Sequence, residues 1–462
     1  MKIIRFTTIA IFFVILLLPV LFFNTKPNQV SEIDNRKLQE FPTSENNSGD
    51  YTKDLENYVN DRIGCRDAMI NAYTVLNDKI FNVMVHPNYS YGKNGYIFLK
   101  TTHNVQYDGY YSQFVRMIKK MEVYCRQRGV PFLFCLQPSK GTVMPQYLES
   151  GLNYDDSWRE EFKSELDEWG VNYVDNTEVL IEKNQDNKVY NVKYDAGHWN
   201  YIGAFYGVNN MLSSMHDDCE EILEIPMEYY ELSYENKTSL IASSFKIDED
   251  VPLLTSDTEI EDLTLEYNPY ISINPTYSYF HYWVNDNIDA YDLPKTLVFQ
   301  GSYMNEIGRN IFKDGVHEYI AVHNYQNVYD LDYYFNIFQP EYVVFEVAEY
   351  TMTDAYFDYE IMKNFSFNPS KETLEVSEQV SEEEINVDLV KEGRIDTFIV
   401  EGIPEECIWA YIEVNGKTLD LIKYEQGIYK ASLADNNIGV GNKVIVYYVI
   451  DDCMYNLVIM TE

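Results

Sequence analysis

The chain has 462 residues and a formal net charge of −39, with 74 Asp and Glu against 35 Lys and Arg. This charge argues against nucleic acid as a partner, because phosphate binding draws on clustered Lys and Arg, and it also opposes docking onto an anionic lipid surface. The length predicts one large domain together with a smaller one.

The N-terminus predicts a membrane anchor. Lys2 and Arg5 precede an uncharged, largely apolar run from Phe6 to Phe23, which at about 1.5 Å per residue covers most of a bilayer core of about 30 Å. The alternative is a cleaved signal peptide, but the run is longer than an ordinary signal-peptide core and residues 24–27 offer no small-x-small cleavage site. Because positive charge ahead of the run indicates a cytoplasmic N-terminus, we expect residues 1–24 to anchor a single-pass cell-membrane protein whose remaining chain is extracytoplasmic.

The six cysteines are scattered along the chain and do not form a disulfide framework. Cys407 and Cys453 both fall near the C-terminus, and the sequence leaves open whether they pair. The chain has neither a CxxC nor an HExxH pattern, so neither a built-in metal site nor a cofactor is expected.

The segment 25–90 reads as juxtamembrane and mainly helical. From Asp54 to Phe81 apolar residues recur at roughly helical spacing, with a break expected at Gly64. Next, Tyr91 to Leu99 predicts a hairpin whose turn is Lys-Asn-Gly.

Helices and strands alternate through residues 91–369, which predicts an α/β domain built on a mostly parallel sheet with helices on both faces. In such a sheet, ligands bind at the carboxyl ends of the strands. The expected helices are 110–128, 158–169, 199–215 and 307–312, and the expected strands are 130–136, 171–175, 295–299, 317–322 and 342–347.

Three further segments complete the organisation. The acidic, tyrosine-rich stretch 217–293 is interpreted as a β-rich insertion in the α/β domain. Residues 370–384 are charge-rich and lack aromatic residues, which is typical of a linker. Residues 385–462 hold short alternating strands and an Asn415-Gly416 turn, which predict a small β-sandwich domain.

One short loop carries the chemistry of greatest interest. Asp195 stands three residues before His198, so a carboxylate can orient an imidazole that acts as a general base. The nucleophile expected for that base is Ser302, which follows an apolar run and Gly301, where a strand-to-loop turn would expose a side chain. Both segments come shortly after predicted strands, so the three side chains can meet at one edge of the sheet.

Several motifs, in this order, resemble the DHHW family and the alginate O-acetylation proteins of the SGNH-hydrolase-like superfamily. After a membrane segment come Ser31-Glu32-x-x-Asn35-Arg36-x-Leu38, the Gly92-Lys93-x-Gly95-x-x-Phe98 element and the Pro138-Ser139-Lys140 loop, followed by Asp and His before Trp199 and then by Ser302. The resemblance covers roughly residues 30 to 350. Two features depart from the usual pattern: Ala196 and Gly197 both separate the acid from the histidine, a gap found in ordinary SGNH esterases, and Gly301 stands where many relatives carry Asp or Thr.

The resemblance implies an SGNH-hydrolase-like domain with Ser302 as nucleophile, His198 as base and Asp195 as its orienter. It also implies O-acetyl transfer to a cell-surface polysaccharide such as an exopolysaccharide, with the acyl group supplied by a multi-span membrane acyltransferase partner. Admission of water would instead make the chain a carbohydrate acetylesterase, since both reactions use the same three residues.

Other residues are candidates for binding the substrate or the oxyanion. Asn305 and the Ser302 backbone N–H are candidates for an oxyanion hole, although Asn305 can equally cap a helix. Lys140 is a candidate for binding an anionic sugar, against a solvated loop charge, and Trp199 is a third binding candidate. A hypothesis of another class remains open, in which the chain is a non-catalytic polysaccharide-binding or assembly protein that works through its C-terminal domain.

Overall fold

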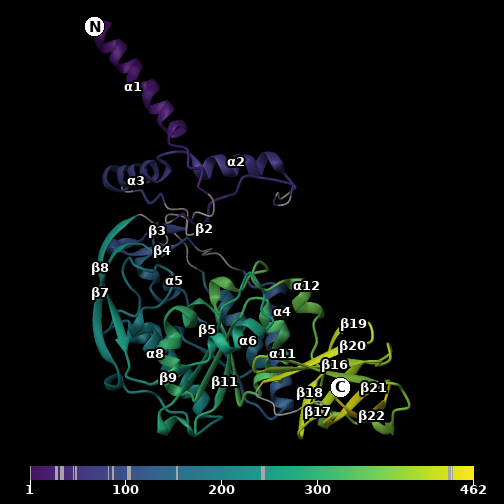
Figure 1. Ribbon diagram of the computed structural model, residues 1–462. Coiled ribbons are helices and arrows are strands. Elements are labelled where there is room, and N and C mark those ends of the chain that lie inside the picture. The colour runs from purple at the N-terminus through teal and green to yellow at the C-terminus, as the bar shows by residue number, and fades with distance from the viewer. Residues whose placement is uncertain are drawn as a thin grey trace.

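The computed structural model describes residues 2–26, 30–31, 36–44, 46, 49–81, 83–85, 88–100, 106–151, 155–240, 245–434, 439 and 441–461 (Figure 1). A mixed α/β body is built on a large sheet flanked by helices. It is joined to an apolar helix at the N-terminus and to further sheets toward the C-terminus. The coarse architecture expected from the sequence is therefore confirmed.

Seven strands form the central sheet, in the order β6-β5-β13-β11-β12-β10-β9. The first five are parallel, and β10 and β9 extend the sheet by antiparallel pairing. Every residue of β5 and β13 is buried, as expected for parallel strands that are covered on both faces. The strands are β5 (Phe132–Gln137), β6 (Tyr173–Asp175), β9 (Ile260–Asp262), β10 (Phe280–Asn285), β11 (Lys295–Gln300), β12 (Glu318–His323) and β13 (Tyr342–Ala348).

Helices cover both faces of this sheet. Successive side chains of a strand point to opposite faces, so Phe134 of β5 belongs to one hydrophobic core and Cys135 to the other. The first core is closed by α4 (Gly109–Gln127), α6 (Ser157–Trp169) and α11 (Leu331–Phe338), and the second by α7 (Thr177–Lys183), α8 (Tyr201–His216) and α10 (Arg309–Phe312).

The segment expected to be an insertion is divided between two structures. Its first part, β7 (Glu231–Ser239) and β8 (Lys246–Thr255), forms a hairpin apart from the central sheet, whereas β9 and β10 belong to that sheet. Strand β10 joins the sheet because it has an apolar side: Phe280 and Tyr282 are buried in the first core. The acidic, tyrosine-rich composition of the whole segment conceals this short alternating pattern.

The N-terminal region stands apart from the α/β body. Helix α1 (Lys2–Leu21) is long and apolar enough to cross a membrane, and α2 (Tyr51–Arg62) and α3 (Arg66–Leu76) lie across its base (Figure 1). The expected break at Gly64 separates α2 from α3, and a Cβ at this position would come within 2.6 Å of the Phe22 backbone. A π-helical turn, η1 (Asn77–Phe81), then leads to the hairpin of β3 (Tyr89–Tyr91) and β4 (Ile97–Leu99). Within the motif that begins at Ser31, residues 32–35 lie outside the described residues.

Two sheets toward the C-terminus face each other across a shared core, which is the arrangement of a β-sandwich. One has the order β14-β22-β21-β17-β18 and the other β15-β16-β20-β19. Strand β14 lies inside the stretch expected to be a linker, and Cys407 and Cys453 are free thiols. The strands are β14 (Ser377–Val380), β15 (Asn386–Glu392), β16 (Ile395–Glu401), β17 (Trp409–Val414), β18 (Lys417–Asp420), β19 (Ile422–Glu425), β20 (Ile428–Ala434), β21 (Lys443–Ile450) and β22 (Cys453–Met460).

A buried ion pair fastens these C-terminal sheets to the α/β body. Arg128, just beyond α4, donates to both carboxylate oxygens of Asp420 on β18 at 2.8 Å. The Tyr124 hydroxyl donates to the same carboxylate at 2.6 Å. Both contacts come from Nη2 of Arg128, and together with the Tyr124 hydrogen bond they hold the C-terminal sheets against the body through one buried carboxylate.

Candidate active site

The loop before α8 brings Asp195 and His198 together. The backbone of Asp195 is left-handed, with φ 48°, and this turns its carboxylate back over the residues that follow. Oδ1 of Asp195 accepts hydrogen bonds from the backbone N–H of His198 at 3.2 Å and from ring Nδ1 at 2.7 Å. The three-residue spacing thus lets one carboxylate oxygen fix both the turn and the ring.

Charge and burial shift the pKa values of Asp195 and His198 in opposite directions. Burial alone would raise the pKa of the Asp195 carboxyl, but the adjacent His198 and two backbone N–H donors outweigh burial and hold that pKa below its ordinary value. Burial alone would lower the pKa of His198, but the Asp195 carboxylate outweighs it and raises that pKa above 6.5. The loop therefore stabilises an imidazolium, which is the form a general base takes after it accepts a proton.

Ser302 lies where β11 ends and a helical turn begins. Its neighbour Gly301 donates its N–H to Oε2 of Glu346 at 2.5 Å, and Asn305 N–H closes the first turn on the Gly301 carbonyl at 2.9 Å. A Cβ on Gly301 would lie 3.0 Å from Glu346 Oε2 and 3.2 Å from Asn324 Nδ2. The serine turn thus packs closely on these two side chains, and a larger residue at 301 would require them to shift by a few tenths of an ångström.

Two aromatic residues join the serine turn to the histidine loop. The hydroxyl of Tyr303 lies 2.7 Å from the carbonyl oxygens of Gly197 and Pro138, and its ring meets the His198 ring edge-on at 5.2 Å. Trp199 donates its indole N–H to the Tyr303 carbonyl at 3.1 Å. Segments about a hundred residues apart in the sequence are thereby held in contact at one edge of the sheet.

A tyrosine lies between the serine and the histidine. The hydroxyl oxygen of Tyr350, just beyond β13, is 3.2 Å from Ser302 Oγ and 3.1 Å from His198 Nε2. Within the described part of the chain, Ser302 and His198 share no direct hydrogen bond. The three expected residues are therefore brought together, but Tyr350 separates Ser302 from His198, and hydrogen bonds run from Asp195 through His198 and Tyr350 to Ser302.

The protonation states decide which group donates in each of these hydrogen bonds. When His198 is neutral and its proton is on Nδ1 toward the Asp195 carboxylate, Nε2 is the acceptor and the Tyr350 O–H donates to it. The Tyr350 oxygen can then accept from the Ser302 hydroxyl. Burial raises the pKa of Tyr350 well above 10, so its hydroxyl stays protonated and can pass a proton on without holding a charge.

A buried glutamate lies beneath the serine turn. Glu346, in the middle of β13, is fully buried, and burial raises the pKa of its carboxyl to about 8. One of its oxygens accepts the Gly301 N–H, and the other has no hydrogen-bond partner within the described chain. Because the carboxyl is mostly protonated at neutral pH, it supports the turn without placing a full negative charge under Ser302.

The groups expected to form an oxyanion hole lie on the same turn. Oδ1 of Asn305 accepts a hydrogen bond from Gln300 Nε2 at 3.2 Å. Among the residues that the structure describes, Asn305 Nδ2 and the Ser302 backbone N–H have no acceptor. Both belong to the turn that Ser302 begins, and they stay candidates for the oxyanion hole.

The sequence predicts that Lys140 and Trp199 contact the substrate, but both side chains are buried inside the protein. The Lys140 ammonium is buried and donates to the carbonyl oxygens of Ile97 at 2.8 Å and Val192 at 3.0 Å. Burial lowers the pKa of Lys140 to about 7. Trp199 is fully buried and packs in the second core. The two side chains position the loop of Asp195, and neither faces solvent as a binding residue would.

The sequence hypothesis misses Tyr350 and Glu346. Both belong to the apolar strand at 342–347 and the residues that follow it, and β13 pairs directly with β11, which precedes Ser302. A signal was available: a charged residue inside a fully buried strand and a tyrosine just past its carboxyl end are unusual placements. Strand order, which the sequence does not state, is needed to connect them with Ser302.

No protein-family model matches the sequence, and no curated protein sequence matches it. Several solved structures are similar to this one. Bacillus cereus PatB1 with a sulfonyl adduct is 16% identical, and the match covers 59% of this chain and 96% of that chain with a TM-score of 0.44. A DHHW family protein from Eubacterium siraeum is 15% identical over 61% of this chain and 100% of that chain, with a TM-score of 0.41. The O-acetyltransferase domain of Pseudomonas putida AlgJ is 13% identical over 60% of this chain and 99% of that domain, with a TM-score of 0.40. The groups that the sequence motifs resemble are thus also represented among the similar structures.

Proposed function

We propose that this chain is a membrane-anchored, SGNH-hydrolase-like enzyme that transfers an acetyl group to a cell-surface polysaccharide. The observation that carries the proposal is the unbroken chain of hydrogen bonds from Asp195 through His198 and Tyr350 to Ser302. A hydroxyl nucleophile connected to an oriented imidazole is the arrangement that acyl transfer requires.

In the first half-reaction, Ser302 Oγ attacks the carbonyl carbon of an acetyl donor. The Ser302 proton passes to the Tyr350 oxygen while the Tyr350 proton passes to Nε2 of His198, and Asp195 stabilises the imidazolium. The bond from the acetyl group to the leaving group then breaks. The leaving group takes the proton back from His198 along the same route, and an acetyl-serine remains.

In the second half-reaction, a hydroxyl of the acceptor attacks the acetyl-serine. Its proton passes to His198, the ester bond to Ser302 breaks, and the serine oxygen recovers a proton. The N–H of Ser302 and Nδ2 of Asn305 are proposed to stabilise the oxyanion in both steps, since donors already in place are worth more than donors that must reorganise. A sugar hydroxyl as acceptor gives O-acetyl transfer, whereas water gives esterase activity.

The proposed setting follows from α1 and from the motif resemblance. Helix α1 is proposed to be an uncleaved anchor that leaves the α/β body outside the cytoplasm, where a cell-surface polysaccharide is accessible. The resemblance to alginate O-acetylation proteins supports a polysaccharide hydroxyl as the acceptor and a multi-span membrane acyltransferase as the source of acetyl groups.

Serine substitutions in the purified full chain test this proposal. We expect Ser302→Ala to abolish hydrolysis of p-nitrophenyl acetate above the buffer rate. Ser214→Ala is the matched control, because Ser214 lies on α8 and its hydroxyl donates to the Asn210 carbonyl one turn earlier in the same helix. Adding an oligosaccharide acceptor should divert acetyl groups from water to sugar. Hydrolysis by Ser302→Ala at the wild-type rate would overturn the proposal, and acetate as sole product would make the chain an esterase.

A further inference from the structure

The helices that follow the anchor expose apolar side chains that nothing in the described chain covers. We call residues 51–81, which comprise α2, α3 and η1, the platform. Helix α3 contains no buried residue. Its exposed side chains Met69, Tyr73 and Leu76 and the following Ile80 are spaced by four, three and four residues, which places them along one helical face. The large exposed apolar residues of the platform are Tyr51, Val59, Met69, Tyr73, Val75, Leu76, Ile80 and Phe81.

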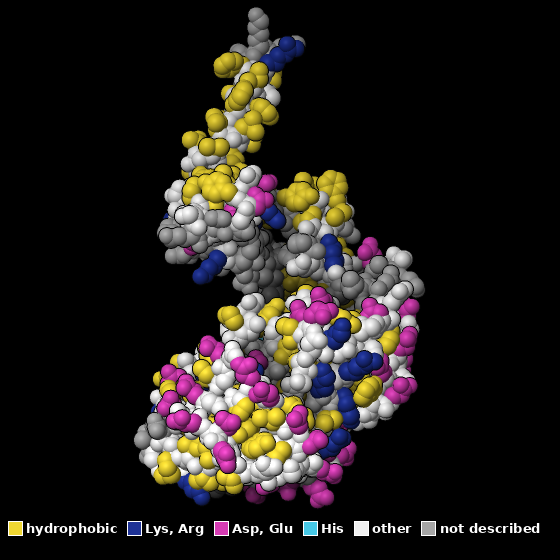
Figure 2. Space-filling view, turned by 90° about the vertical axis from the view of Figure 1, so that its right-hand side faces the viewer, with side chains coloured by type: hydrophobic (Ala, Val, Ile, Leu, Met, Phe, Trp, Pro, Cys, Tyr) yellow, Lys and Arg dark blue, Asp and Glu magenta, His cyan; other side chains and the backbone are white. Residues whose placement is uncertain are grey.

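An apolar helical face of this kind implies a covering surface. Helices of this length are marginal in water unless an apolar face packs against something, and contiguous exposed apolar patches are typical of surfaces that bind a membrane or a protein. Figure 2 shows that hydrophobic side chains cover α1 and gather again at the level of the platform, whereas on the body below it they are interspersed with many charged side chains. The apolar face of the platform therefore continues the apolar surface of α1.

Hydrogen bonds fasten the platform to the base of α1. The Gly64 N–H donates to the Pro19 carbonyl at 2.8 Å, and the Asn24 N–H donates to the Arg62 carbonyl at 2.8 Å. The Arg62 guanidinium donates in turn to the carbonyl oxygen of Lys26 at 2.5 Å. Because α2 and α3 lie across the end of α1, a bilayer spanned by α1 would meet the platform at the level of its headgroups (Figure 1).

The charge of the platform indicates the kind of lipid surface. It carries four Lys and Arg and five Asp and Glu, so it is close to neutral although the whole chain has a net charge of −39. A neutral apolar face on an acidic protein fits zwitterionic lipid, because anionic lipid would repel the rest of the chain.

We infer that the platform lies in the headgroup region of the membrane that α1 spans and holds the Ser302 edge of the central sheet facing that membrane. This inference concerns the orientation of the protein and goes beyond the proposed chemistry. It depends on the proposed anchoring by α1, but it does not depend on acyl transfer.

A direct series of contacts connects the platform with the candidate active site. The Tyr91 hydroxyl on β3 donates to the Asp78 carboxylate of η1 at 2.6 Å. Next to it on the same hairpin, the Ile97 N–H donates to the Val192 carbonyl at 2.9 Å, just before the loop of Asp195 and His198. One short hairpin thus contacts both the platform and the segment that leads into the histidine loop, and it connects their orientations.

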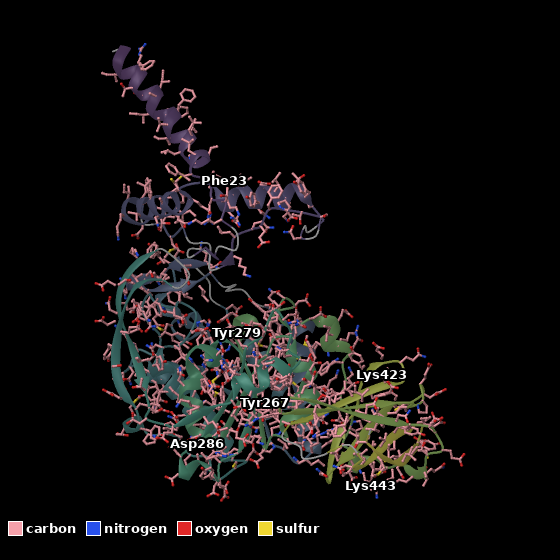
Figure 3. All side chains as sticks on the ribbon, in the orientation of Figure 1. Phe23, Tyr267, Tyr279, Asp286, Lys423 and Lys443 are labelled. Carbon is pink, nitrogen blue, oxygen red and sulfur yellow. The ribbon has the colours of Figure 1, made fainter. Side chains whose placement is uncertain are left out.

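The direction of the central sheet agrees with these contacts. Tyr279 lies at the carboxyl-end edge of the parallel strands, since its carbonyl accepts the N–H of His323, the last residue of β12. Asp286, just past the other end of β10, marks the opposite edge. In Figure 3, Tyr279 lies on the side of Phe23 and the platform, and Asp286 lies on the far side. The edge that carries Ser302 is therefore the edge that faces the platform.

Fluorescence quenching by brominated lipid tests the inference in the full chain. The protein is reconstituted in vesicles of phosphatidylcholine or of dibrominated phosphatidylcholine, after its intact mass has shown that α1 is retained. We compare Tyr73→Trp on the platform with the matched control Tyr424→Trp near the C-terminus, since these tyrosines are 60% and 62% exposed. Lys423, the neighbour of Tyr424, lies well away from the platform in Figure 3.

We expect the emission that Tyr73→Trp adds to the wild-type spectrum to shift to the blue and to lose most of its intensity in brominated vesicles. The emission that Tyr424→Trp adds should be the same in both kinds of vesicle. Added emission from Tyr73→Trp that is red-shifted and unquenched would mean that the platform stands in water. Blue-shifted emission that bromine does not quench would mean that protein, such as a second copy, covers it. Either result would overturn the inference, and neither depends on activity.

Discussion

Removal of one oxygen tests the most unusual feature of the site. Tyr350→Phe deletes the hydroxyl that contacts both Ser302 Oγ and His198 Nε2 and keeps the ring that packs near Tyr303. In the described chain no other group contacts both atoms. The variant should therefore fold normally, at a cost of about 1 kcal/mol for the lost hydrogen bonds, while Ser302 loses its path to the base.

The expected loss of activity follows from the role of that path. General-base assistance contributes about 10²–10⁴-fold to a reaction rate. If the Tyr350 hydroxyl carries the proton, its removal should lower kcat/KM by a factor in this range, or about 2.7–5.5 kcal/mol of transition-state stabilisation. Adding Tyr350→Phe to Ser302→Ala should then cause no further loss, because both changes interrupt one path.

Ester hydrolysis by the purified full chain provides the assay. The matched control is Tyr190→Phe, which also deletes a buried hydroxyl close to the site; that hydroxyl bonds to the Pro138 carbonyl, which Tyr303 still contacts. We expect Tyr190→Phe to retain activity within about tenfold, less than the loss of a base. A Tyr350→Phe enzyme as active as the wild type would refute the relay, because it would mean that Ser302 reaches His198 directly once the ring moves.

Three other substitutions test the surroundings of the site. Asp195→Asn removes the anion that raises the pKa of His198, so the acid limb of the pH–rate profile, which requires neutral imidazole, should move to lower pH while the maximal rate falls; an unmoved limb would contradict the assignment. Glu346→Gln tests the carboxyl whose pKa burial raises to about 8: the folded chain keeps a proton there that the unfolded chain releases at lower pH, so wild-type stability should fall as pH rises toward 8. Thermal denaturation at several pH values should show that the stability of the variant lacks this fall. Melting temperatures that change with pH in parallel for wild type and variant would disprove the role of Glu346. Lys140→Met leaves two backbone carbonyls without their donor and should cost about 1–3 kcal/mol of unfolding free energy in denaturant titration; no loss would show that Lys140 does not support the loop.

The sequence predicts the periodic elements well. Helices such as 157–169 end at a glycine with left-handed backbone, and strands such as 132–137 are apolar up to their last residue, so local pattern and tertiary packing agree. The spacing of Asp195 and His198 also predicts their contact, because it is closed by a local turn. Ser302 could be connected with them only through its order along the chain and the family resemblance.

What the sequence does not predict depends on long-range packing. Tyr350 reaches the site because β13 lies between β5 and β11, and strand order is a property of the whole sheet. Lys140 looks like a solvated charge in the sequence but is buried, since the carbonyls of two distant segments converge on its ammonium. Strand β10 is concealed in an acidic segment because a half-buried strand near the margin of a sheet needs only a few apolar residues.

The central claim is that Ser302 carries the acyl group. The full chain is incubated briefly with p-nitrophenyl acetate, quenched in acid and analysed by intact mass and peptide mapping. Wild-type protein should gain one acetyl group, located on the peptide that contains Ser302, and Ser302→Ala should gain none. Acetylation of wild type and Ser302→Ala to the same extent, or at another residue, would contradict the account.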